Sequence, residues 1–108
     1  MIQIKTIDNI NRNGDLEVNE INGEIIKIVV FSNKEVSTIK LKCRTLSEEI
    51  LIDDYLIGRI TTFYPRRIIT VNEGQSLAEY FCTFNQLFLS LEGLSEIDYI
   101  HKIIIYYK

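Results

Sequence analysis

The chain is poor in the residues that build helices and metal sites. Its 108 residues hold twenty isoleucines but a single alanine, Ala78. Alanine is the best helix former, whereas β-branched side chains fit a pleated surface, so the composition favours strands over a helical bundle. The only histidine, His101, and the two cysteines, Cys43 and Cys82, include no close pair that starts a zinc chelate. With glycines scattered singly and no phosphate-binding loop, we expect neither a metal nor a cofactor.

Long apolar runs and excess positive charge are also missing. The longest uncharged stretch, residues 80–91, spans 12 residues and is too short to cross a bilayer. Lys5, Asp8 and Arg12 stand where a signal peptide needs an apolar run. Twelve Lys and Arg against 15 Asp and Glu give a net charge of −3, which argues against direct binding of nucleic acid through phosphate neutralisation. We expect a soluble, unexported protein with no membrane contact and with both cysteines as reduced core thiols.

The length and the overall composition predict one folded domain over residues 1–108. Apolar residues make up 46% of the chain and charged residues 25%, as in ordinary globular proteins. No internal repeat, low-complexity tract or linker interrupts it, and 108 residues fall within the usual size of one domain.

Two Asn-Gly pairs punctuate the first third of the chain. Asn13-Gly14 and Asn22-Gly23 are each flanked by alternating apolar residues, and Asn-Gly is a strong signal for a tight hairpin turn. This pattern predicts three meandering strands over residues 2–10, 16–21 and 25–31.

Further strands follow from alternation and turn signals. Ile39, Leu41 and Cys43 alternate with three basic residues, which predicts a strand with one buried face. Pro65 interrupts the extended stretch 59–71 and divides it into two strands. Additional strands are expected at 50–52 and 100–107, with a turn at 72–76.

Residues 77–88 allow two interpretations. Six apolar or aromatic residues fall at helical spacing, and Ser76 with Glu79 fits a capping box. Against a helix stand the aromatic-rich run 80–84 and the period-two run Leu87, Leu89 and Leu91. We favour two strands, so the expected fold is an all-β, antiparallel β-sandwich of about eight to ten short strands, with a short helix at 77–88 as the alternative.

Reactive groups do not converge anywhere in the sequence. A regular last strand places His101 on the same face as Ile103 and Ile105, as a partly buried edge histidine. Neither cysteine has the local signature of a nucleophile. The pairs Glu48-Glu49 and Asp53-Asp54 point to opposite faces of an extended chain and are interpreted as solvated turn acids. We expect no enzyme and no catalytic residues.

The most distinctive string is residues 61–67, Thr-Thr-Phe-Tyr-Pro-Arg-Arg. Tyrosine and arginine are enriched at protein interfaces, which makes Tyr64, Arg66 and Arg67 candidate contact residues. The alternative is that one arginine pairs internally with Glu48, Glu49, Asp53 or Asp54 and the other is exposed. The sequence leaves both open.

The string Phe63-Tyr64-Pro65-Arg66, within a small β domain, resembles a segment of the small β-sandwich structural proteins of tailed bacteriophages. The resemblance extends over roughly residues 25–108 through the strand at 68–71, Glu79-Tyr80 and the last strand, with Phe63 in place of an expected tyrosine. It implies a non-enzymatic virion component, either a head decoration (auxiliary capsid) protein or a head-to-tail connector or ring subunit.

The resemblance also implies the partners and the location. They are copies of the chain itself, as a homo-oligomer, and other virion proteins such as the major capsid, portal or connector protein, in the virion and in the host cytoplasm during assembly. Terminal strands pair readily with neighbouring chains, so the N-terminal hairpin and residues 103–107, with Tyr106 and Tyr107, are the expected contact segments.

A binding module for carbohydrate or protein is the second functional reading. Tyr55, Tyr64, Tyr106 or Tyr107 would then serve as exposed stacking platforms. The absence of tryptophan, the largest aromatic side chain, argues against it.

Overall fold

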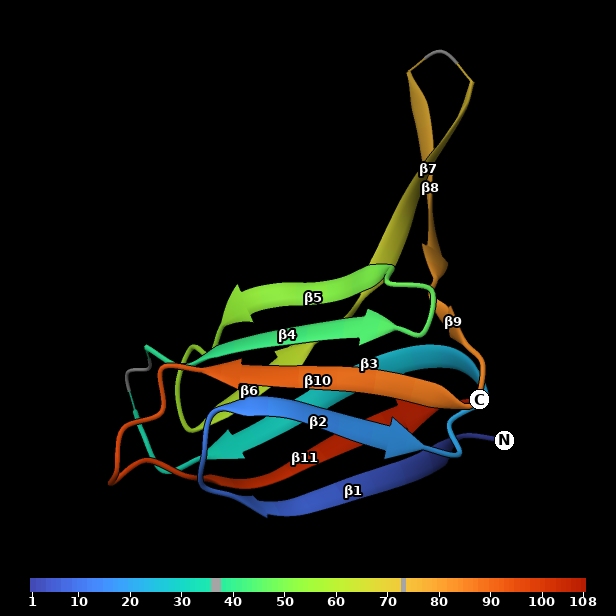
Figure 1. Ribbon diagram of the computed structural model, residues 1–108. Coiled ribbons are helices and arrows are strands. Elements are labelled where there is room, and N and C mark those ends of the chain that lie inside the picture. Colours follow the sequence, from blue (N-terminus) through green and yellow to red (C-terminus); the bar gives the residue numbers. More distant parts are fainter. Residues whose placement is uncertain (36–37, 73) are drawn as a thin grey trace.

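The computed structural model describes residues 1–35, 38–72 and 74–108, and in these residues the chain forms eleven strands and no helix (Figure 1). Two antiparallel sheets pack face to face, and a separate two-stranded hairpin projects from one end. This confirms the all-β sandwich and the strands favoured over a helix at 77–88. In the described part of the chain, no helix is long and apolar enough to cross a membrane.

Each sheet of the sandwich combines strands from distant parts of the chain. The first sheet has the order β1 (Gln3–Ile10), β11 (Ile100–Tyr107), β3 (Gly23–Ser32) and β6 (Ile60–Phe63), and β9 (Cys82–Thr83) also pairs with β3. The second has the order β2 (Gly14–Asn19), β10 (Gln86–Glu92), β4 (Lys40–Thr45) and β5 (Ile50–Tyr55). The projecting hairpin consists of β7 (Arg66–Asn72) and β8 (Gln75–Tyr80).

The core lies between the two sheets and is almost entirely aliphatic. Alternate side chains of β4 and β10 are buried, as the period-two pattern predicts. Burying one isoleucine or leucine side chain stabilises a fold by about 1.5–3 kcal/mol. The largest fully buried side chains are Ile21, Ile25, Ile28, Ile39, Leu41, Leu56, Leu87, Leu89, Leu91, Ile100, Ile103 and Ile105.

The two Asn-Gly turns do not form hairpins, so the predicted meander is wrong. β1 pairs with β11 and β2 pairs with β10, and each turn crosses from one sheet to the other. The Asn13 amide donates to the Leu94 carbonyl (3.1 Å) and its Oδ1 accepts from the Leu94 N–H (2.8 Å). Asn22 Oδ1 likewise accepts from the Asn85 N–H (2.8 Å). These asparagines therefore bind distant loops instead of closing tight turns.

A bulge at the start of β11 overturns the face predicted for His101. The register with β3 shifts between Ile100 and Lys102, so Ile100 and Ile103 are both buried although two residues separate them. His101 is consequently exposed, and its ring stands edge-on to Tyr99 with 4.6 Å between centroids.

The turn predicted at 72–76 connects β7 to β8, where Asn72 lies opposite Gln75 and Gly74 has a positive φ. Glu73 of that turn lies outside the described residues.

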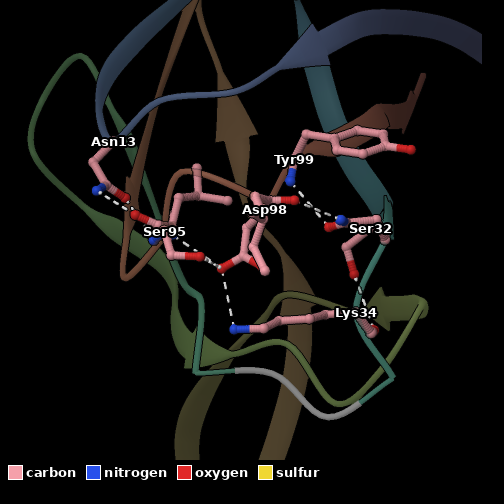
Figure 2. A network of polar contacts seen from close by, with 9 residues as sticks. Asn13, Ser32, Lys34, Ser95, Asp98 and Tyr99 are labelled. Atoms are coloured by element: carbon pink, nitrogen blue, oxygen red, sulfur yellow. Dashed lines mark hydrogen bonds and ion pairs between the residues drawn. The ribbon is translucent and has the colours of Figure 1, made fainter.

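A polar network holds the loop that leads into β11 (Figure 2). The Asp98 side chain is 2% exposed, accepts hydrogen bonds from the Ser95 N–H (3.0 Å) and hydroxyl (2.9 Å), and pairs with Lys34 Nζ (3.1 Å). Asn33 accepts from the Tyr99 N–H (3.0 Å) in the same network. The Ser95 N–H, more than the Lys34 ammonium, lowers the pKa of Asp98 below its ordinary value.

Gly23 occupies a position that only glycine fits. Its φ is +116°, and a Cβ atom there would lie 2.3 Å from the backbone oxygen of Lys108. That oxygen also accepts a hydrogen bond from the Glu24 N–H (2.7 Å), so it is held in place. Gly14 has a similar φ of +122°, but a Cβ atom there meets open space.

We expect Gly23→Ala to destabilise the protein by about 1–3 kcal/mol more than Gly14→Ala, because only the former adds a backbone clash to the strained φ. Thermal unfolding of the two variants measures the difference. Equal melting temperatures would show that the approach of Lys108 to Gly23 relaxes without cost.

We also expect Asp98→Asn to lower the melting temperature at neutral pH and to have little effect in acid. A lowered folded-state pKa contributes stability above the unfolded value of about 3.9, and this contribution is lost as the pH falls through the folded pKa. Melting curves of both proteins from pH 7 to pH 2 test this. Asp15→Asn, at an exposed position of β2, is the control. A deficit that stays constant over this range would contradict the ionic role of Asp98.

Candidate functional site

The projecting hairpin is the most unusual surface of the protein. β7 and β8 rise away from both sheets (Figure 1). Ile68 lies opposite Ala78 and Ile69 lies opposite Leu77, so the two pairs occupy opposite faces of the ribbon. Ile68 is 67% exposed and Leu77 is 58% exposed. Large apolar side chains therefore face solvent on both faces of the hairpin.

Arg66 anchors the base of the hairpin to the first sheet. Its Nη1 donates to the carbonyl of Ile26 in β3 (2.9 Å) and to that of Pro65 (2.7 Å). Its guanidinium carbon lies 4.0 Å from the ring centroid of Tyr80, the residue opposite it on β8. Lys108 Nζ lies 5.6 Å from the same centroid. Hydrogen bonds and cation–π contacts thus join β7, β8 and β3.

Arg67 ties the same base to the second sheet. It pairs with Glu79 across the hairpin (3.2 Å) and with Glu49, which directly precedes β5. Its guanidinium also lies 5.3 Å from the ring centroid of buried Phe81. The internal ion pair with Glu49 is one of the alternatives left open by the sequence, whereas Arg66 is partly buried instead of simply exposed. Whether either arginine also contacts a partner stays a prediction.

Tyr64 lies beside the hairpin base, 63% exposed, at the open margin between β5 and β6. It lines a hollow of about 200 Å³ together with Asp53 and Asp54. Asp53 pairs with Lys40 (2.9 Å), and the hydrogen bond from Lys40 lowers the pKa of Asp53. Tyr55 is also exposed, with Lys40 Nζ 5.9 Å from its ring centroid.

The last strand has no free edge for the strand pairing that its terminal position predicts. β11 lies between β1 and β3, so both of its edges are already paired. Tyr107 is 6% exposed, and its hydroxyl lies 3.5 Å from the Glu20 carbonyl, which makes it a core residue and not a stacking platform. Tyr106 is half-buried beneath Lys27, whose Nζ lies 4.6 Å from the ring centroid.

The two cysteines differ in environment. Cys43 is buried in β4, and burial raises the pKa of its thiol to about 12. Cys82 is exposed, contrary to the prediction of two core thiols, because Thr83 takes the inward position of the two-residue strand β9. Among the described residues, no three His, Cys, Asp or Glu side chains are grouped closely enough to hold a metal ion.

A second apolar surface lies near the foot of the hairpin. The β4–β5 turn provides Leu46, strand β9 provides Cys82, and the β9–β10 turn provides Phe84. These residues line a hollow of about 430 Å³, and Phe84 is 82% exposed.

Sequence reasoning missed both of these surfaces. It considered Leu77 and Phe84 only as members of a set of apolar residues at helical spacing, and the structure exposes both side chains on strands and turns. A signal for the hairpin was present, since Glu73 is the only charged residue between Arg67 and Glu79. Only the fold shows that Ile68 and Leu77 lie outside the core.

We expect Arg66→Ala to lower stability by about 1.5–3 kcal/mol, because it removes hydrogen bonds from a charged donor to two carbonyls. Arg59→Ala is the matched control. Its ion pair with Glu35 is 3.6 Å long and exposed, and its loss is expected to cost less than about 0.5 kcal/mol. Urea unfolding measures both variants, and equal losses would show that Arg66 does not anchor the hairpin.

No protein-family model matches the chain, and neither does a curated protein or a solved structure.

Proposed function

We propose that this chain is a non-enzymatic structural protein of a bacteriophage virion that acts by assembling with other proteins. The observation that carries the proposal is the β7–β8 hairpin, which stands clear of the sandwich and exposes Ile68 and Leu77 to solvent. Exposed apolar surface of this kind marks sites of protein–protein contact. The phage resemblance of residues 63–66, at the foot of this hairpin, supplies the biological setting.

The base of the hairpin suits it to this role. Arg66 and Arg67 hold the two strands against both sheets through hydrogen bonds and ion pairs. A contact element that is held in place before binding loses less conformational entropy when it binds. Repetition of the contact around a symmetric particle then gives lasting attachment even where one contact is weak.

The proposed partners are copies of the chain and other virion proteins, such as the major capsid, portal or connector protein. The proposed role is that of a head decoration (auxiliary capsid) protein or of a head-to-tail connector or ring subunit. The chain then resides in the virion and, during assembly, in the host cytoplasm.

Mass spectrometry of purified virus particles tests this function. The particles come from cells in which the chain is expressed from the genome that encodes it. We expect the chain to remain on washed particles at a constant ratio to the major capsid protein. A double variant, Ile68→Ser with Leu77→Ser, removes two side chains that would each contribute about 1.5 kcal/mol on burial. It is expected to weaken attachment by roughly a hundredfold.

The control is Ile57→Ser with Ile97→Ser, which changes two exposed isoleucines on loops of the sandwich. Circular dichroism verifies that both double variants are folded. Washed particles that lack the wild-type chain would refute the virion assignment. Equal retention of the two double variants would show that attachment does not use the hairpin.

One observation favours the second reading, a carbohydrate-binding module. The hollow beside Tyr64 combines an aromatic ring with two carboxylates, and such groups stack on and hydrogen-bond to sugars. Its volume of about 200 Å³ is, however, below the roughly 300 Å³ at which ligand pockets begin. Binding of the recombinant chain to a glycan array, abolished by Tyr64→Ala, would establish this reading instead.

A further inference from the structure

The edges of the hairpin differ from the edges of the sandwich. An edge strand presents unpaired N–H and C=O groups, and proteins block such strands with charges, bulges, proline or short length. In β1, Lys5 lies on the core-facing side opposite Ile105, and Asn9 has a φ of +53°. β5 carries Asp53 and Asp54, β2 carries two acidic residues, and β6 has four residues and ends close to Pro65. Each outer strand of the sandwich therefore carries a feature that opposes pairing.

The hairpin has few of these features along its length. Its charged residues Arg66, Arg67 and Glu79 lie at the base, and a register shift lies near the tip, between Thr70 and Asn72. Residues 68–72 and 74–78 include no charged residue and no proline. Among the described residues, β7 pairs with β8 alone and β8 pairs with β7 alone, so each strand keeps one free edge. A lone two-stranded ribbon is marginally stable in water and gains stability from a third strand. The hairpin is thus the part of the described structure best suited to strand addition.

We infer that the hairpin pairs edge to edge with the hairpin of a second copy of this chain. β8 of one copy lies beside β7 of the next, with both hairpins pointing the same way. β7 leads away from the sandwich and β8 returns to it, so the added pair is antiparallel, like the ladder within each hairpin. This inference rests on the proposed function, because it names the partner used in assembly.

Charge complementarity selects this arrangement. Within a hairpin, Arg67 lies opposite Glu79, Ile68 opposite Ala78 and Ile69 opposite Leu77. When the two hairpins are aligned at the same height, β8 of one copy and β7 of the next bring together the same residue pairs that lie opposite each other within one hairpin. Arg67 of one copy then faces Glu79 of its neighbour, and apolar residues face apolar residues above them. In the alternative arrangement, the β8 strands of two copies pair with each other and the two hairpins point in opposite directions. Glu79 would then lie opposite uncharged residues of the neighbouring β8 and would gain no positively charged partner.

The arrangement also determines the form of the assembly. The free edges of β7 and β8 lie on opposite sides of the ribbon, so each copy uses two different surfaces. Such a heterologous contact adds copies one after another until they close into a ring or extend as a filament.

Mixed cysteine crosslinking tests the pairing. Ile68→Cys and Ala78→Cys are made as two separate proteins, each with Cys82→Ser to remove the exposed native thiol. Residues directly opposite each other in antiparallel strands bring their Cβ atoms close enough for a disulfide. We expect a disulfide-linked dimer when the two proteins are mixed under mild oxidation, and none from either protein alone.

Two controls accompany the mixture. Ile57→Cys replaces Ile68→Cys as an exposed position away from the hairpin and is expected to give no crosslink. Adding Leu77→Lys to both crosslinking proteins puts a charge on the uncharged stretch and is expected to reduce the crosslinked fraction several-fold. Ile97→Lys at an exposed loop position is expected to leave it unchanged.

The inference is overturned if the mixture gives no dimer, or if either protein alone gives as much dimer as the mixture. Failure here is distinct from failure of the proposed function. If the chain remains on washed particles but gives no crosslink between copies, its hairpin binds a different virion protein. A chain that crosslinks as expected but is absent from particles would self-assemble outside a virion.

Discussion

The burial of alternate aliphatic side chains between two sheets is the constraint on which the rest of the structure depends. β3, β4, β10 and β11 supply most of the fully buried isoleucines and leucines. Because the side-chain period of a strand is two, a shift of one residue would expose an entire buried face. The packed core therefore fixes the register of these strands, and the bulge at His101 restores the inward position of Ile103 after Ile100.

Around this core, the loops are joined by side chains that bind distant backbone. Asn13 binds Leu94, Asn22 binds Asn85, and Asp98 binds both Ser95 and Lys34. Each contact satisfies polar groups that would otherwise lose hydrogen bonds when the loops pack on one another. Hydrogen bonds and an ion pair therefore tie the connections between the sheets to one another, and the hairpin rises from this framework.

The β7–β8 hairpin differs from the sandwich on which it stands. It has no second layer over either face within the described residues, yet Arg66 and Arg67 hold its base to β3 and to the residue before β5. The hairpin therefore combines a held base with uncharged strand segments that expose Ile68 and Leu77, whereas the outer strands of the sandwich carry charges or are short. This contrast within one molecule is the physical basis for proposing that the protein acts through contacts with other chains.

The sequence by itself determined the strand content and the buried face of most strands, because period two and β-branched residues depend on near neighbours alone. It also offered four acidic partners, Glu49 among them, for one of the two arginines, but it did not decide which arginine pairs. Only the tertiary structure decided which strands pair, since an Asn-Gly turn permits a hairpin but distant loops compete for its asparagine. Contacts between distant residues likewise place β11 inside its sheet, bury Tyr107 and leave Ile68 and Leu77 exposed outside the core. Pairing and exposure depend on residues far apart in the chain, and no local pattern encodes them.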